Sequence, residues 1–139
     1  MQIKKATFKH VEAELYNYHD TKKEIQRLRQ EIIYASDTDP DENDTKGKNS
    51  VRTITRPTEL IATRLTSNKQ LRNLEEIIDA IDSVYEKLDP DQQRLVKLRY
   101  WSRKNDWPNV ASECKMSEST AYRHRRYIVL AIAHRIGWR

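Results

Sequence analysis

The chain has 139 residues, of which 37% are hydrophobic and 34% charged, and its formal net charge is +5. This composition can fill one modest core or two small ones, so a large enzyme fold is excluded. Two glycines exclude a Gly-rich phosphate loop, one cysteine excludes an internal disulfide and favours the reducing cytoplasm, and no apolar run is long enough to span a membrane.

Residues 1–36 are predicted to form a separate pair of helices that mediates interactions. The chain is expected to break near His19 and Asp20, and Thr21 with Glu24 has the spacing of a capping box that starts a second helix. Two helices of this size cannot bury themselves alone, so they must pack on the rest of the chain, on a second copy or on another protein. The apolar stripes consist of Phe8, Val11, Leu15 and Tyr18, followed by Ile25, Leu28 and Ile32.

Residues 37–56 have few apolar groups, alternating charges, a proline and a glycine, which is typical of a flexible linker. The acidic start of this segment invites comparison with a calcium-binding loop. However, the sixth position is Glu42 rather than glycine and the twelfth is Lys48 rather than glutamate. A solvated linker is therefore the better interpretation.

Residues 57–89 are predicted to form central helices. A short helix is expected from Pro57 to Thr66, and Ser67 with Gln70 forms a capping box for a longer helix. The apolar residues of the longer helix follow a heptad pattern that is wider than a narrow coiled-coil seam, so packing within the subunit and homodimer formation are both open. These residues are Leu71, Leu74, Ile77, Ile78, Ile81, Val84, Tyr85 and Leu88.

Residues 90–139 are predicted to form a helix-turn-helix domain. Asp89 and Gln92 indicate the start of a helix from Pro90 to about residue 103, which should brace the unit that follows. This bracing helix carries Leu95, Leu98, Tyr100 and Trp101.

The helix-turn-helix unit itself begins with Asp106, which can cap a first helix that has Pro108 in its first turn. Lys115 and Met116 form the turn, although Lys115 occupies a position where such turns often carry glycine. Ser117 then caps a long second helix, residues 118–136, and Gly137 suits the left-handed position beyond its end. The inner face of the two helices is predicted to contain Val110, Ala111, Cys114, Ala121, Ile128, Ile132 and Ile136.

The outer face of the second helix carries the candidate functional residues. In a helix-turn-helix, the second helix lies in the major groove of DNA, and its exposed side chains contact base edges. The candidate base readers follow three- and four-residue spacing and are Glu118, Ser119, Tyr122, Arg123 and Arg126. The candidate phosphate contacts are Lys97, Arg99, Arg103, Lys104, Ser117, Thr120 and Arg125.

The charge distribution supports contact with nucleic acid. Residues 90–139 contain eleven Lys or Arg against four Asp or Glu, a net charge of +7, whereas the other residues have a net charge of −2. A basic patch of this kind favours phosphate binding through counterion release. The alternative is that the basic helix face is merely solvated, as most charged runs are.

An enzyme is not predicted. The four histidines, His10, His19, His124 and His134, do not pair with a carboxylate or cysteine in metal-ligand spacing, so we expect no catalytic residue, metal or cofactor. Cys114 is expected to be a packing residue. Trp101, Trp107 and Trp138 flank helix ends and are better explained as core anchors than as a base-stacking platform.

The chain also resembles known families. The segment from Leu88 to Gly137 contains LDPDQQRLVKLRYW and WPNVASECKMSESTAYRHRR, and it resembles the fourth region of bacterial sigma factors, which reads the promoter −35 element. The whole chain is similar to phage late transcriptional regulators of the RinA and ArpU type. That similarity includes VEAELYNYHDTKKEIQRLRQEI, the linker and SNKQLRNLEEIIDAIDSVYEKLDPDQQ.

The resemblance implies an all-α DNA-binding activator of the phage late genes for packaging, morphogenesis and lysis. Its partners would be double-stranded promoter DNA and host RNA polymerase, in the cytoplasm of the host bacterial cell, with no membrane involved. Two alternatives stay open. Small terminase subunits, which act in DNA packaging, also join a helix-turn-helix to helical oligomerisation segments, and a pure interaction adaptor would use the basic face to bind an acidic protein.

Overall fold

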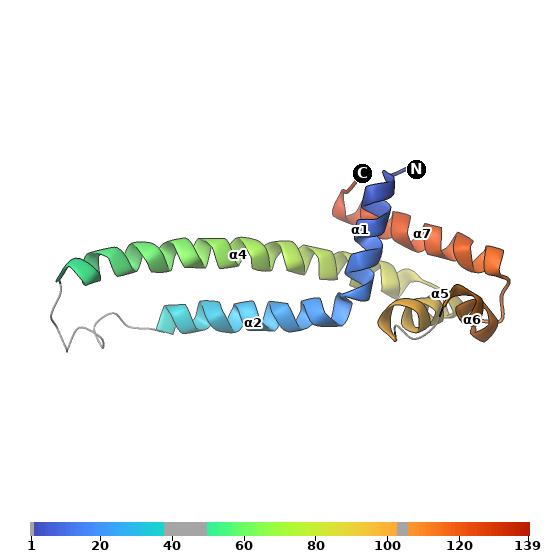
Figure 1. The fold of residues 1–139 in the computed structure, drawn as a ribbon, viewed down its shortest axis with the longest axis horizontal. Helices are drawn as coiled ribbons and strands as arrows, with labels where there is room; N and C mark the ends of the chain where they lie inside the picture. The colour runs from blue at the N-terminus through green and yellow to red at the C-terminus, as the bar shows by residue number, and fades with distance from the viewer. Residues whose placement is uncertain (1, 38–49, 103–105) are drawn as a thin grey trace. The chain divides into compact units, whose positions relative to one another are not determined.

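The computed structural model describes residues 2–37, 50–102 and 106–139, and these residues form an all-α fold without strands (Figure 1). None of the described helices is long and apolar enough to cross a membrane. In chain order, the helices are α1 (Lys5–Tyr16), α2 (Tyr18–Asp37), α4 (Ser50–Lys87), α5 (Pro90–Val96), the π-helix η1 (Lys97–Trp101), α6 (Trp107–Glu113) and α7 (Glu118–Ile136).

These helices form two compact units. Unit 1 contains Met1–Lys22 and Glu76–Arg139, and unit 2 contains Lys23–Glu75. The structure therefore groups the residues differently from the predicted domains, because α1 belongs to the same unit as α5, α6 and α7. The N-terminal pair is divided between the two units within α2.

The turn between α1 and α2 lies at Asn17, earlier than the break predicted near His19 and Asp20. The predicted capping box at Thr21 is not used, because the Thr21 amide donates to the carbonyl oxygen of Asn17 (2.7 Å) within the first turns of α2. Tyr18 explains the difference: it is buried and its ring stacks on Trp101 at 4.7 Å. Tertiary packing here overrides a local capping signal.

The predicted break before Ser67 is also wrong, because α4 is one continuous helix from Ser50 to Lys87. Its first residues, 50–56, occupy part of the predicted linker, while residues 38–49, including Glu42 and Lys48, lie outside the described residues. The sequence between Pro57 and Lys87 contains neither glycine nor a second proline. Extending an existing helix costs less than nucleating a new one, so a capping signal alone does not interrupt it.

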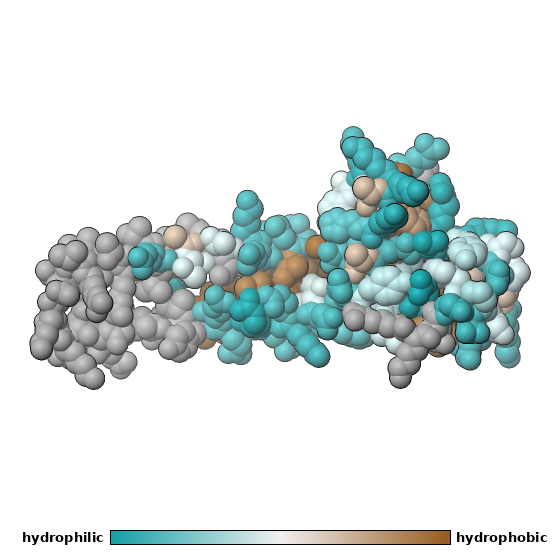
Figure 2. Space-filling view, viewed as in Figure 1, coloured by the Kyte–Doolittle hydropathy of each residue, from teal (hydrophilic) through white to brown (hydrophobic). Residues whose placement is uncertain are grey.

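Unit 2 contains the C-terminal part of α2 and the N-terminal part of α4. Ile25 and Leu28 of α2 are buried, and Arg29 forms an ion pair with Glu75 of α4 (2.8 Å). Figure 2 shows hydrophobic side chains gathered where the two helices run alongside each other, whereas hydrophilic residues cover most of the visible part of α1.

The core of unit 1 joins α1 and the end of α4 to the helix-turn-helix. Tyr100 is fully buried in this core. Each large aliphatic side chain that is buried there contributes about 1.5 to 3 kcal/mol to the stability of the fold. The C-terminal part of the predicted heptad stripe therefore packs within the chain. The core is lined by Leu15, Ile81, Leu88, Val96, Ile128 and Ile132.

The helix that braces the helix-turn-helix begins as the sequence predicts. The carboxylate of Asp89 accepts a hydrogen bond from the Gln92 amide (2.9 Å), and the Gln92 side chain accepts one from the Asp89 amide (3.3 Å). This reciprocal pair is the predicted capping box. The helix continues as the π-helix η1 and ends at Trp101, close to the predicted end at residue 103.

Candidate nucleic-acid interface

The first helix of the helix-turn-helix, α6, is capped by the predicted residue. The carboxylate of Asp106 accepts a hydrogen bond from the Asn109 amide (3.0 Å), and Pro108 lies in the first turn. Trp107 and Val110 are buried and fasten the helix to the core. The predicted cap and inner face of α6 are therefore confirmed.

The turn between α6 and α7 is held by backbone hydrogen bonds. The Lys115 amide donates to the Ser112 carbonyl oxygen (3.1 Å), and the Met116 amide donates to that of Ala111 (3.0 Å). These two bonds form a Schellman motif, which requires a residue in the left-handed conformation. Lys115 is that residue, with a φ of 57°. The position that often carries glycine thus has the backbone conformation that favours glycine.

The second helix, α7, is capped at both ends by the predicted residues. The Ser117 hydroxyl accepts a hydrogen bond from the Thr120 amide (3.2 Å) and donates one to the Thr120 hydroxyl (2.9 Å). Gly137 adopts the left-handed conformation with a φ of 93°. Ser117 and Thr120, which were predicted phosphate contacts, therefore use their hydroxyl groups to begin the helix.

The inner face of α7 packs against the rest of unit 1. Ala121, Ile128 and Ile132 are buried as predicted, whereas Ile136 is half-buried. Cys114, at the end of α6, is buried, and burial raises the pKa of its thiol. A thiol with a raised pKa is a poor nucleophile at neutral pH, which agrees with its prediction as a packing residue.

The five candidate base readers are all exposed on α7, and we refer to them as the α7 ridge: Glu118, Ser119, Tyr122, Arg123 and Arg126. Tyr122 is 43% exposed, and its ring lies 5.5 Å from that of Trp107. Tyr127, which was not among the predicted residues, follows Arg123 by one helical turn and is 59% exposed. No described part of the chain covers the ridge.

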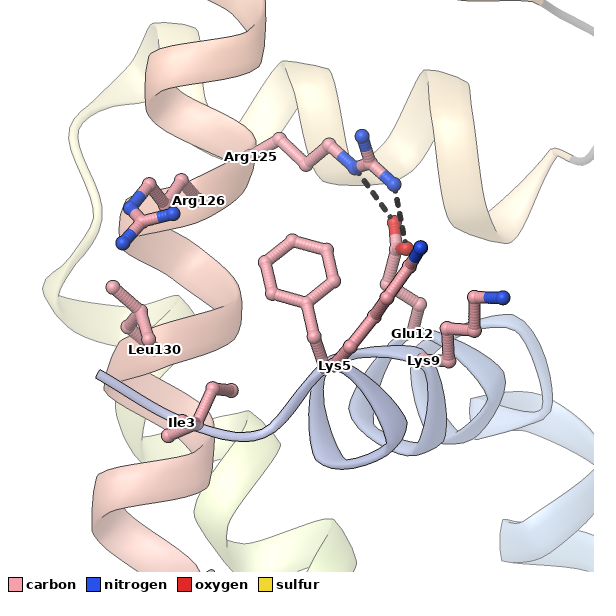
Figure 3. Close-up of a pocket in the computed structure, with 8 residues that line it drawn as sticks. Ile3, Lys5, Lys9, Glu12, Arg125, Arg126 and Leu130 are labelled. Carbon is pink, nitrogen blue, oxygen red and sulfur yellow. Dashed lines mark hydrogen bonds and ion pairs between the residues drawn. The ribbon is translucent and has the colours of Figure 1, made fainter. Parts of the chain in front are cut away.

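Arg125 differs from its prediction as a phosphate contact. Its guanidinium forms two hydrogen bonds with the carboxylate of Glu12 on α1, Nε to Oε2 (2.9 Å) and Nη2 to Oε1 (2.7 Å), as Figure 3 shows. The guanidinium also lies 5.1 Å from the ring of Phe8 and 5.3 Å from that of Trp107. Arg125 therefore fastens α7 to α1.

Glu12 is the central acceptor of this contact. Its carboxylate also accepts a hydrogen bond from the hydroxyl of the buried Tyr100 (2.7 Å). Burial raises the pKa of Glu12, but hydrogen bonds from Arg125 and Tyr100 and the charges of Arg125 and Arg99 outweigh it, so that the pKa is lowered. The hydrogen bond to Glu12 raises the pKa of Arg125 in turn. Both partners therefore stay charged near neutral pH.

The remaining predicted phosphate contacts have different environments. Lys97 is exposed, whereas Arg99 is half-buried and its guanidinium lies over the rings of Tyr16 (5.3 Å) and Trp107 (5.1 Å). Arg103 and Lys104 lie outside the described residues. Arg99 thus stabilises the contact between α1 and η1 through cation–π interactions.

Aromatic and imidazole rings occupy the junctions between helices. Trp101 packs against Tyr18 and against Tyr85 (4.8 Å), and Trp138 stacks on His10 of α1 (4.2 Å). His124 lies 3.0 Å from the side-chain nitrogen of Gln92 on α5, which explains a polar residue where helix-turn-helix units usually have an apolar one. Together with the buried Trp107, these contacts confirm the tryptophans as packing anchors.

Glu12 was not predicted as a functional residue, because nothing local distinguishes it from other surface glutamates. The only available signal was its place beside Val11 in the apolar stripe, where a carboxylate needs a cationic partner once the stripe is buried. The partner, Arg125, lies 113 residues further along the chain.

The fold and the α7 ridge define an all-α protein with a helix-turn-helix whose second helix exposes polar, aromatic and cationic side chains. Residues 10–134 match the family described as "Protein of unknown function (DUF722)", and the chain belongs to this family. No curated protein and no solved structure matches the chain.

Proposed function

We propose that the protein is a sequence-specific DNA-binding transcriptional activator that reads promoter DNA with α7. The observation that carries this proposal is the α7 ridge: five exposed side chains able to contact bases project from one helix that is capped at both ends and fastened to a core. Such a helix can enter a major groove without rearrangement, and rigid presentation of the side chains reduces the entropic cost of binding.

The chemistry of the ridge matches the base edges of DNA. Arg123 and Arg126 can each donate two hydrogen bonds to a guanine, and Glu118 can accept one from a cytosine amine. Ser119 can bond several bases, and Tyr122 can pack against a sugar or a thymine methyl group.

Phosphate contacts would come from groups around the ridge. Lys97 is exposed and can act as a non-specific contact, as can Arg103 and Lys104, which lie outside the described residues. The backbone amides at the start of α7 offer a further anion site, since a helix N-terminus carries partial positive charge. Arg125 would act indirectly, because its hydrogen bonds to Glu12 of α1 fix the position of α7.

The biological setting rests on the resemblance to RinA and ArpU type regulators. The resemblance implies that the target is the phage late genes for packaging, morphogenesis and lysis, and that the partner is host RNA polymerase in the bacterial cytoplasm. A homodimer would place two copies of α7 on repeated half-sites. The alternative is a DNA-packaging role like that of small terminase subunits, which would require a ring of subunits.

Selection of duplexes from a random pool, followed by measurement of the affinity for the selected site, tests the proposal. Arg123→Ala should cost about 1 to 3 kcal/mol on the selected site and relax the preference at one base position. Lys97→Ala is the matched control and should weaken all duplexes alike. Failure to select any sequence, or equal losses on specific and random duplexes for both variants, would contradict reading by α7. Assembly into a ring of many subunits would instead favour DNA packaging.

A further inference from the structure

A groove lies between α1 and α7, beside the α7 ridge (Figure 3). Its volume is about 420 Å³. Arg126 belongs both to the ridge and to the wall of this groove. The other lining residues are Ile3, Lys5, Phe8, Lys9, Glu12, Arg125 and Leu130.

The groove has an excess of positive charge. Its one carboxylate, Glu12, is neutralised by the two hydrogen bonds from Arg125. Lys5, Lys9 and Arg126 have no ion pair with any residue that the structure describes, and Lys5, Lys9 and Arg126 are all exposed. Three cations that line one groove and have no ion pair within the described residues give it an excess of positive charge, which favours an anionic ligand.

The start of α1 adds to this preference. Lys4 at its N-cap makes no side-chain capping bond, and the first turn contains no acidic residue. The partial positive charge of the helix N-terminus is therefore not offset by a local carboxylate. The apolar side chains of Ile3, Phe8 and Leu130 supply a surface for a ligand that also has non-polar carbon atoms.

We propose that this groove binds the sugar–phosphate backbone of the DNA whose bases are read by α7, with Lys5 and Lys9 as phosphate contacts. The proposal rests on the proposed function, and it adds α1 to the DNA-binding surface. Continuity through Arg126 favours the backbone of the same duplex over a separate anion. Deoxyribose can pack against the apolar side chains while the flanking phosphates face the lysines.

The experiment compares the full-length protein with a Lys5→Ala/Lys9→Ala variant. Both lysines are exposed and alanine has a high helix propensity, so the variant should fold. The control variant, Lys23→Ala/Lys69→Ala, removes the same charge from exposed positions of unit 2. Affinity for the selected duplex and for a random duplex is measured as a function of salt concentration, with circular dichroism as a check on folding.

The groove variant should bind both duplexes roughly tenfold more weakly, and the slope of log K against log salt should fall by about 1.8, because two phosphate contacts are lost. The control should keep the slope of the unmodified protein. Base preference should be the same in all three proteins, since backbone contacts carry no direct sequence information.

Three outcomes would overturn the inference. If the unmodified protein binds duplex DNA and the groove variant has the same slope, the groove is not a backbone site, while the proposed function stands. Poly-L-glutamate is measured as a model of an acidic protein. If the groove variant keeps its affinity for both duplexes but loses its affinity for poly-L-glutamate, the groove binds an acidic protein. Absence of duplex binding by the unmodified protein would remove both proposals together.

Discussion

The chain changes direction in two short turns of unit 1, at Asn17 between α1 and α2 and at Lys115–Ser117 between α6 and α7. The helix-turn-helix that contains the second turn is specified locally: Asp106, Lys115 and Ser117 make their defining hydrogen bonds to residues within five positions. The first turn depends on distant partners. Tyr18 stacks on Trp101 and hydrogen-bonds to Asp82, and no side-chain cap begins α1.

The two ends of unit 1 therefore depend on different forces. The helix-turn-helix has its own caps and turn chemistry, whereas α1 is held in place by burial of Val11 and Leu15 and by the contact between Glu12 and Arg125. Removing a long-range partner should therefore cost more stability than removing a local cap. Four predictions test this difference.

The largest effect is expected for Glu12→Ala. The change leaves the half-buried Arg125 without its counterion and the buried hydroxyl of Tyr100 without its acceptor, so the free energy of unfolding should fall by about 2 to 3 kcal/mol. Urea unfolding measures this loss. Glu31→Ala is the control, because Glu31 pairs with Arg27 on an exposed face, and it should change the stability by less than about 0.5 kcal/mol.

The stability difference between the unmodified protein and Glu12→Ala should also depend on pH. The pKa of Glu12 is lowered in the folded state, so its contribution is fully present above the ordinary value of 4.5 and is lost as the pH falls through the lowered pKa. Unfolding curves at pH 7 and at pH 3 should show a smaller difference at the lower pH. A difference that is constant with pH would show that the carboxylate charge does not stabilise the contact.

A smaller effect is expected for Asp106→Ala, which removes the cap of α6. The free energy of unfolding should fall by about 1 kcal/mol, the usual value for a lost side-chain cap. Ser112→Ala, on the exposed face of the same helix, should have little effect. If Asp106→Ala cost as much as Glu12→Ala, the distinction between local and long-range stabilisation would be wrong.

The smallest effect, of opposite sign, is expected for Lys115→Gly. A non-glycine residue in the left-handed conformation is strained, and relief of this strain exceeds the entropy that glycine adds to the unfolded chain. Stability should rise by about 0.5 to 1 kcal/mol in thermal or urea unfolding. Lys115→Ala keeps the strain and should give no gain. A loss of stability for the glycine variant would indicate that the lysine side chain has a stabilising contact.

Elements with local signals were predicted well. The capping box at Asp89, the caps at Asp106 and Ser117 and the left-handed Gly137 all have the predicted roles. The same kind of signal failed at Thr21 and at Ser67, where the helix continues. A capping motif is only a weak preference of a few residues, and packing or the propagation of a longer helix overrides it.

The candidate site was predicted in part. Helical periodicity correctly placed all members of the α7 ridge on an exposed face, because the spacing of side chains around a helix follows from its geometry alone. Periodicity could not distinguish Arg125 from Arg123 or Arg126 in chemical role. That distinction depends on whether another helix supplies a carboxylate.

The sequence by itself determined the all-α class, the helix-turn-helix with its caps and the residues exposed on α7, since each follows from interactions among residues close in the chain. Only the tertiary structure decided that α1 packs on α7 and that Glu12 pairs with Arg125. The tertiary structure alone also showed that Lys5 and Lys9 line a groove together with Arg126. Such contacts join residues more than one hundred positions apart, and no local preference of the chain encodes which distant partner a buried charge will meet.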